Sequence, residues 1–240
     1  MQFFRYHGAI PSSERKDRAM ITVINESKQV SIPTWVVDLE SFRRWVDADD
    51  FPEDGRIWYL KGEVWIDMSK EQIFTHVLVK TEITIVLGNL VKTADLGLFL
   101  GDGALLSNLA ADISGKPDAM FVSQDALQRR RIQLVEGWDE GHVELEGTPD
   151  MVLEVVSRSS VHKDTVVLRQ AYWQAGIREY WLVDARQEPV RFNILRRTAK
   201  GYAATRKQDG WLKSAVFGKS FQLTQRINAL GHPEYTLAVR

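Results

Sequence analysis

Two acidic residues lie inside apolar stretches of this sequence, and their side chains belong to the types that hold divalent cations. Glu154 is surrounded by the apolar residues of the run Met151–Val156, and Asp118 opens a second apolar run directly after Pro117. Burying a lone carboxylate costs several kcal/mol unless a cation or hydrogen bonds compensate it. Two carboxylates on neighbouring strands can converge on one hard cation, so the pair predicts a metal site.

Other interpretations of Glu154 stay open: the carboxylate can lie on a half-exposed strand, or it can be paired with a lysine or arginine. Asp150 is a rival partner for Glu154, because it also follows a proline and lies on the same face of the expected strand. Four residues of strand separate the two by roughly 13 Å, which is too far to share one ion. Asp118 on an adjacent strand is therefore the better partner.

Carboxylate ligands favour Mg²⁺ or Mn²⁺, which polarise a phosphate oxygen and lower the pKa of a bound water. The pair therefore predicts hydrolysis of a phosphodiester bond. This reaction also needs a positive group near the phosphate, for which Lys163 and Arg169 are the nearest candidates in sequence. Ordinary surface charge on a helix is the competing interpretation for each of them.

Three further residues could take part in such a site. His76 could donate to phosphate or act as a base, although a lone histidine on a helix is more often structural. Glu63 could contribute a third carboxylate. Asp164 stands near the start of an expected helix, where it could cap that helix or hold the lysine or arginine of the site in place.

The elements that must position these residues follow from hydrophobic spacing and from turn residues. The buried strand at 149–157 is followed by a helix at 163–175, which Gly176 ends, and then by a buried strand at 179–185. This order predicts a right-handed crossover and a parallel pair of strands. Four other segments are expected: a helix near 41–49, a β-hairpin or bulged strand pair at 56–68 with Lys61-Gly62 in its middle, a long helix at 71–92, and a charged loop at 124–147.

The predicted fold class is α/β, or mixed α+β, with a central mixed β-sheet flanked by helices. Its last strands, from Val190 onward, are expected to form an antiparallel extension of the sheet. The 240 residues suit one domain, with an N-terminal extension at 1–30, a main domain at 31–225 and a C-terminal tail at 226–240. The short run ITVI within the extension is a candidate edge strand.

Composition narrows the choice of function. The 31 basic and 32 acidic residues give a formal net charge of −1, which neither indicates nor excludes binding to nucleic acid. Local basic faces could form at 129–131 and 196–207, although solvated surface charge is the simpler interpretation. The absence of cysteine excludes disulfides, thiolate zinc sites and cysteine nucleophiles. No secretory signal and no run near the ~20 apolar residues of a membrane span were found, so we expect a cytoplasmic protein without a membrane partner.

The segments PDMVLEVVSRSSVHKD and AYWQAGIREYWLVDA closely resemble the Uma-two family of restriction-endonuclease-like proteins, long catalogued as a domain of unknown function. The resemblance runs from about Trp35 to about Leu223. Within the two segments the matching positions include Ser157, Asp164 and Tyr172, and outside them Gly62-Glu63, His76 and Pro117-Asp118 also match. It implies a PD-(D/E)XK nuclease-like fold and magnesium-dependent cleavage of nucleic acid, most simply DNA. It also implies Asp118 and Glu154 as metal ligands, and Glu63 and His76 as further residues of the site.

Two departures concern the lysine of the motif and an additional acid. Val156 stands two residues after the glutamate, where the motif has its lysine, and the family commonly lacks the lysine there as well. Many members instead carry a lysine in the next helix, and here that position is Leu168, beside Arg169. Trp58 stands where the family often has an additional glutamate. The cationic role is therefore not assigned by the resemblance.

Three hypotheses follow. In the leading one the chain is an endonuclease in which Asp118, Glu154 and Glu63 hold Mg²⁺ or Mn²⁺, while His76 with Lys163 or Arg169 contacts phosphate. The alternative is an inactive module of the same fold that binds nucleic acid or a protein. The third is a structural protein whose buried glutamate is merely paired with an arginine, which predicts no metal affinity and a loss of stability when Glu154 alone is changed. A homodimer is a further expectation, because enzymes that cut both strands often act as dimers and strands at 190–221 could pair across a two-fold axis.

Overall fold

The computed structural model describes residues 4–7, 20–25, 28–52, 55–137 and 141–240, and it is a mixed α/β structure. The helical elements are α1 (Leu39–Val46), η1 (Ile73–Val77), α2 (Leu78–Thr93), α3 (Gln124–Gln128), η2 (Lys163–Val167) and α4 (Leu168–Gln174), of which η1 and η2 are π-helical turns. The strands before α4 are β1 (Phe4–His7), β2 (Met20–Asn25), β3 (Lys28–Pro33), β4 (Arg56–Leu60), β5 (Glu63–Asp67), β6 (Gly97–Leu100), β7 (Leu105–Asn108), β8 (Ile113–Gly115), β9 (Ala119–Ser123), β10 (Ile132–Glu136), β11 (His142–Gly147) and β12 (Met151–Val155). The strands after α4 are β13 (Glu179–Asp184), β14 (Arg191–Thr198), β15 (Gly201–Ala204), β16 (Leu212–Lys213), β17 (Ser220–Ile227) and β18 (Pro233–Val239).

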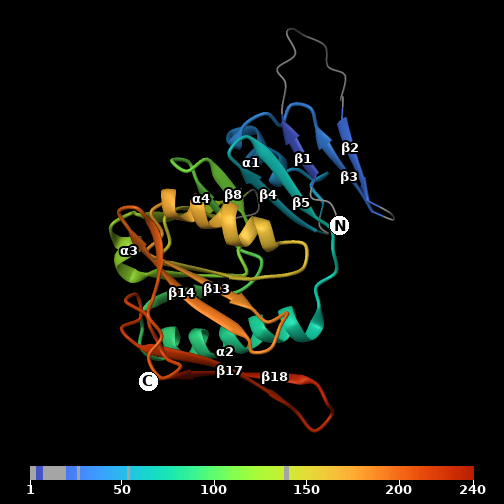
Figure 1. Cartoon of the computed structure of the whole chain (residues 1–240). Coiled ribbons are helices and arrows are strands. Elements are labelled where there is room, and N and C mark those ends of the chain that lie inside the picture. Colours follow the sequence, from blue (N-terminus) through green and yellow to red (C-terminus); the bar gives the residue numbers. More distant parts are fainter. Residues whose placement is uncertain (1–3, 8–19, 26–27, 53–54, 138–140) are drawn as a thin grey trace.

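Two sheets form the body of the molecule. The seven-stranded sheet has the order β1-β5-β4-β8-β7-β11-β10, and the six-stranded sheet has the order β15-β14-β13-β12-β9-β6. Helix α4 lies between these two sheets, as Figure 1 shows. Its buried residues Leu168, Ala171 and Tyr172 join a core that contains Trp58 of β4 and Val152 of β12.

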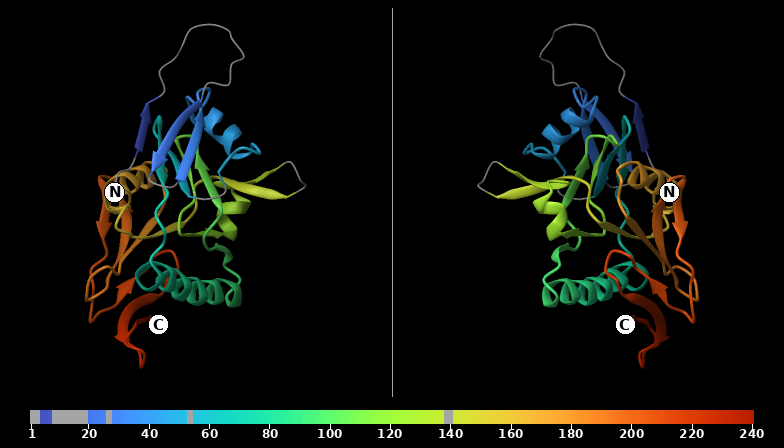
Figure 2. Two further views of the ribbon diagram at one scale, coloured as in Figure 1. Left: turned by 90° about the vertical axis from the view of Figure 1, so that its right-hand side faces the viewer. Right: turned by 90° about the vertical axis from the view of Figure 1, so that its left-hand side faces the viewer.

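The other face of the six-stranded sheet is covered by α2, through a stripe of four fully buried residues. The three-stranded sheet β16-β17-β18 then covers the far side of α2 (Figures 1 and 2). A side-chain oxygen of Glu82 on α2 accepts a 2.8 Å hydrogen bond from the backbone of Leu237 on β18. The segment 226–240, which was predicted to be a C-terminal tail, therefore contains a paired strand that covers one side of the core.

The helix at Ile73–Thr93 is long and apolar enough, by length and composition alone, to cross a membrane. The sequence reading missed this property. Val79, Ile83, Leu87 and Val91 are all buried against the six-stranded sheet and the C-terminal strands, and 28% of the span is buried in all. Such a helix is weak evidence for a membrane span.

The local predictions around the site are confirmed. β12 pairs in parallel with β13 across the η2–α4 crossover, and β14 adds to β13 in antiparallel fashion. Gly176 ends the helix with φ +83°, a conformation that favours glycine. Lys61 and Gly62 join β4 and β5 with φ values of 53° and 83°, as a two-residue hairpin turn requires. The ITVI run lies within β2.

Two expectations differ from the structure. The single central sheet is replaced by two principal sheets, together with the smaller β16-β17-β18 and β2-β3 sheets. The segment at 124–147 is not a charged loop, because α3, β10 and β11 occupy most of it. The β10–β11 hairpin projects from the edge of the seven-stranded sheet (Figure 2), and two of its acidic side chains, Glu144 and Glu146, pair with Arg43 of α1, so charged residues interrupt the strand pattern in the sequence.

Candidate functional site

Asp118 and Glu154 lie on adjacent strands of the six-stranded sheet, as their sequence context predicts. Asp118 immediately precedes β9, which pairs antiparallel with β12 so that Ala119 is opposite Leu153. Continuing this register by one residue sets Asp118 opposite Glu154 on the same face of the sheet. The backbone N–H of Val155 also donates a 2.7 Å hydrogen bond to Oδ2 of Asp118. Both carboxylates are buried, with exposures of 5% for Asp118 and 3% for Glu154.

Glu154 points into the layer between the two principal sheets. The hydroxyl of Tyr172 donates a 2.6 Å hydrogen bond to Oε1 of Glu154, and Nζ of Lys163 lies 3.9 Å from Oε2. Burial raises the pKa of Glu154 well above its ordinary value; Lys163 opposes this rise, while Asp118 and Asp164 add to it. The site therefore favours a proton or a further cation beside this carboxylate.

Lys163 begins the π-helical turn η2, which directs its side chain inward instead of into solvent. Its Nζ is 2.6 Å from Oδ1 of Asp164, and it lies 4.9 Å from the ring centroid of Trp58 on β4. Burial lowers the pKa of Lys163, but Asp164 and Glu154 outweigh that effect, so its net shift is upward. Asp164 thus holds the lysine in place, which is the second of the two roles that the sequence allows for it.

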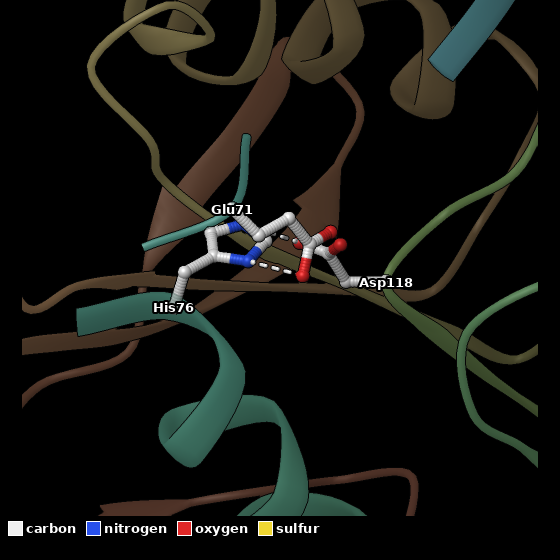
Figure 3. Close-up of side chains that lie close together, drawn as sticks. All are labelled: Glu71, His76 and Asp118. Carbon is white, nitrogen blue, oxygen red and sulfur yellow. Dashed lines mark ion pairs between the residues drawn. The ribbon is translucent and has the colours of Figure 1, made fainter. Parts of the chain in front are cut away.

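Asp118 also belongs to a second cluster, which it forms with Glu71 and His76 (Figure 3). Nδ1 of His76 is 3.4 Å from Oε2 of Glu71, and Nε2 is 3.6 Å from Oδ2 of Asp118. One potential ligand atom from each residue lies within 4.8 Å of the others. The contact with His76 is the main reason why the pKa of Glu71 falls to about 2. Lys80 lowers this pKa as well, and burial opposes the fall. This carboxylate is therefore ionised throughout the neutral range.

Glu71 and Lys80 complete the site, and sequence reasoning assigned neither. Nζ of Lys80 is 2.8 Å from Oε1 of Glu71, 2.6 Å from Oδ2 of Asp102 and 3.7 Å from Oδ1 of Asp118. The spacing of His76 and Lys80 is a usable signal, because residues four apart share one face of a helix. Glu71 lies in the link between β5 and η1, where no periodicity marks it.

A hydrogen-bonded network fixes the loops around this cluster. Arg56 of β4 contacts both Asp67 and Glu71, each at 3.2 Å. Asp67 accepts a 2.8 Å hydrogen bond from the hydroxyl of Ser159, and that hydroxyl is 3.0 Å from the hydroxyl of Ser69. The link that carries Glu71 is thereby tied to the loop that leads from β12 to Lys163.

Two residues predicted from the sequence occupy other places. Glu63 begins β5 and accepts a 3.1 Å hydrogen bond from Nε1 of Trp65; the acid of β5 that reaches this network is Asp67, four residues along the strand. Arg169 lies on the exposed outer face of α4 and donates a 2.8 Å hydrogen bond to the carbonyl of Tyr202. The structure therefore brings together Asp118, Glu154, His76 and Lys163, but not Arg169.

The arrangement suits a divalent cation. Six carboxylates surround the three cations Arg56, Lys80 and Lys163, which leaves negative charge in excess; they belong to Asp67, Glu71, Asp102, Asp118, Glu154 and Asp164. In octahedral magnesium sites neighbouring ligands are about 3.0 Å apart and opposite ligands about 4.2 Å apart, so the ligand atoms of Glu71, His76 and Asp118, which lie within 4.8 Å of one another, would have to move closer together to hold the ion. Nδ1 of His76 is moreover a buried nitrogen that makes no hydrogen bond of good geometry among the described residues, with Oε2 of Glu71 3.4 Å away. Such a nitrogen is available as a ligand.

Comparisons with known proteins bear on the family and the fold of this chain. A protein-family model described as "Uma2: Putative restriction endonuclease" matches residues 39–226. No curated protein matches the chain. A crystal structure described as "a putative nuclease belonging to DUF820 from Anabaena variabilis ATCC 29413" is similar, with a TM-score of 0.55 and 16% identity, over 76% of this chain and 91% of that one. At this identity the likeness shows the fold, and it confirms the predicted mixed α/β class.

Proposed function

Because this chain belongs to the Uma2 family of restriction-endonuclease-like proteins, we propose that it is a metal-dependent endonuclease that hydrolyses phosphodiester bonds in nucleic acid, with DNA as the expected substrate. One observation carries the proposal: two carboxylates from adjacent strands, Asp118 and Glu154, meet a buried lysine on one side and a Glu-His pair on the other. Ligands for a cation and groups that stabilise phosphate charge are thereby collected in one place.

Asp118 is the central ligand of the proposed site, with Glu154 across the strand pair and Glu71 or His76 on the helical side. Bound there, Mg²⁺ or Mn²⁺ would polarise a phosphate oxygen and lower the pKa of an attacking water. Tyr172 holds one oxygen of Glu154 and leaves the other directed towards Lys163. The carboxylate is thus oriented before a cation enters.

Lys163 takes the cationic role that the Uma-two resemblance leaves unassigned. The motif has its lysine two residues after the glutamate, where this chain has Val156. Here the ammonium group of Lys163 approaches the carboxylate of that glutamate, Glu154. Preorganised positive charge of this kind stabilises the charge that develops on a phosphate during hydrolysis. Asp164 keeps the ammonium group in this position, and the face of Trp58 packs beside it.

Cleavage of plasmid and single-stranded DNA with Mg²⁺ or Mn²⁺ tests the proposal, and RNA serves as the competing substrate. The variants Asp118→Asn and Glu154→Gln keep the size of each side chain and remove one negative charge. Metal-dependent nicking by the wild type that both variants lose would support the nuclease. Equal residual cleavage by all three proteins would indicate contamination and favour the alternative of an inactive module that binds nucleic acid or a protein.

We also propose that two copies act together on duplex DNA, because cutting both strands calls for two sites. The segment expected to pair across a two-fold axis contains β15, which is an edge strand of the six-stranded sheet. Light scattering across a wide range of concentrations tests this proposal. A monomer throughout that range, with and without DNA, would contradict it.

A further inference from the structure

Lys80 is the one site cation that α2 supplies, and two carboxylates hold it closely in the described structure. Glu71 and Asp102 accept from its ammonium group at 2.8 and 2.6 Å, and Asp118 lies further away at 3.7 Å. The side chain of Lys80 is only 9% exposed. Its charge is therefore directed at the proposed metal ligand Asp118 and at whatever group lies beside that ligand.

Asp102 differs from the other acidic partners of Lys80 in exposure and in attachment. Its side chain is 54% exposed, against 29% for Glu71 and 6% for Asp118. It lies between β6 and β7, in a turn flanked by Gly101 and Gly103, of which Gly103 has φ +105°. Within the described part of the chain, Lys80 is the only hydrogen-bond partner of the Asp102 side chain.

Glu71 is held much more firmly than Asp102. Besides Lys80, it contacts Arg56 at 3.2 Å and His76 at 3.4 Å. An anion that enters the site from solvent therefore meets Asp102 as the partner that is easiest to displace. The exchange costs little, since a half-exposed carboxylate regains water when it leaves an ion pair.

We propose that Lys80 binds a non-bridging phosphate oxygen of the substrate, and that Asp102 occupies this position in the free protein until a nucleic-acid phosphate displaces it. The inference rests on the proposed function, and it adds a substrate-binding residue and an internal competitor to that site. A phosphate next to Asp118 lies within reach of Lys80, because the two side chains are already 3.7 Å apart. Exchanging one oxyanion for another keeps the buried ammonium group paired throughout.

The variant Asp102→Asn tests the competitor, because it keeps the shape of the side chain and removes its charge. Binding of a short fluorescein-labelled DNA duplex, followed by anisotropy with Ca²⁺ as the cation, gives a readout that does not depend on cleavage. We expect Asp102→Asn to bind about three- to tenfold more tightly than the wild type. We expect Lys80→Gln to bind about tenfold more weakly, and adding Asp102→Asn to Lys80→Gln to change nothing further.

Asp125→Asn is the matched control. The carboxylate of Asp125 is 56% exposed and lies 2.6 Å from Arg129 and 3.6 Å from Arg131, so its exposure and its shortest distance match the Asp102–Lys80 pair, but Arg129 is 73% exposed and neither arginine contacts a residue of the site in the described structure. Both variants change the net charge equally, and we expect the control to bind DNA as the wild type does. Thermal unfolding of each variant verifies that it is folded.

The outcomes separate the two proposals. If the wild type and Asp102→Asn bind DNA equally, Asp102 is not a competitor, and the proposed nuclease is unaffected. The same conclusion follows if Asp102→Asn strengthens DNA binding as much in the Lys80→Gln background as in the wild type. Failure of both proteins to bind any nucleic acid would overturn the proposed function as well.

Discussion

Glu154 has a raised pKa in the folded protein, because burial outweighs the attraction of Lys163. When the folded pKa of an acid is higher than its unfolded pKa, the protein loses stability as the pH rises above the unfolded value. Ionised Glu154 therefore destabilises the folded protein at about pH 7. Glu154→Gln keeps an acceptor for the hydroxyl of Tyr172 and removes the charge. We expect this variant to unfold at the same temperature as the wild type or a higher one in EDTA, and to lose most of the stabilisation that Mn²⁺ gives.

Differential scanning fluorimetry with increasing Mn²⁺ checks both parts of this prediction. The competing structural hypothesis gives the opposite pattern. If Glu154 only neutralises a buried cation, removing its charge costs about 3–5 kcal/mol, and Mn²⁺ stabilises neither protein.

A second prediction concerns which glutamate is the third acid of the site. Glu63 follows from the family resemblance, whereas the geometry favours Glu71, whose ligand atom lies within 4.8 Å of those of His76 and Asp118. We expect Glu71→Gln to raise the Mn²⁺ concentration for half-maximal thermal shift by about tenfold, a typical effect of losing a group near a metal. Glu63→Gln is the matched variant, and we expect it to change that concentration by less than about twofold. The reverse ranking would restore Glu63 to the site.

The residues of the site were predictable to different degrees. Asp118 and Glu154 could be found from the sequence because each places a charge in an apolar strand, which is costly without a partner. His76 and Lys163 lie on helices, where a polar residue is ordinary, and only their inward direction distinguishes them. Glu71 gives no local signal, because its role depends on a link that Arg56 and the Asp67 network hold in place.

At the scale of elements, Asp150 anchors the entry to β12. It is fully buried, accepts a 2.8 Å hydrogen bond from the backbone of Ser123 before α3, and contacts Arg131 at 2.9 Å and Arg178 at 3.3 Å. Burial acts to raise its pKa, but the hydrogen bonds from Ser123 and Arg131 outweigh burial and lower it. Asp150 therefore joins three elements, and the sequence argument that kept it out of the metal site agrees with this structural role.

A lowered pKa means that the stabilisation from Asp150 is present above its unfolded pKa of about 3.9 and is lost as pH falls through the folded value. We expect Asp150→Asn to cost about 1–3 kcal/mol at about pH 7, because buried donors lose a charged acceptor. The difference from the wild type should shrink below about pH 4. Urea unfolding across this pH range measures it, with Glu234→Gln as a control at the exposed Arg226–Glu234 pair. A difference that stays constant with pH would contradict the argument.

Hydrophobic spacing in the sequence predicts a helix or strand well wherever one face of that element is buried. The η2–α4 helix, its glycine stop and the parallel β12–β13 pair were all predictable, because short-range patterns specify them. The π-helical turns η1 and η2 were not, because a π-turn adds one residue without changing the composition of a helix. Both turns carry residues of the candidate site: His76 lies on η1, and Lys163 and Asp164 lie on η2.

At the scale of the molecule, the site needs both principal sheets. Asp118 and Glu154 come from the six-stranded sheet, whereas Arg56 and Trp58 come from β4 of the seven-stranded sheet and contact Glu71 and Lys163. Which strands join which sheet depends on contacts between distant segments, and no single sequence shows this division. The alignment of the two sheets therefore determines the geometry of the ligands.

The last prediction tests this dependence with two buried tryptophans. Trp58, 2% exposed, packs between the sheets against Lys163 and Tyr172, whereas Trp181 is fully buried on the opposite face of the six-stranded sheet against Phe192, Phe217 and Phe221. Trp→Phe at either position leaves a cavity, and we expect each variant to lose about 1–3 kcal/mol of unfolding free energy in urea. Only Trp58→Phe should also weaken Mn²⁺ binding, measured by calorimetry at a temperature where both variants are folded. Equal weakening in both would show that Mn²⁺ affinity follows global stability, and not the alignment of the two sheets.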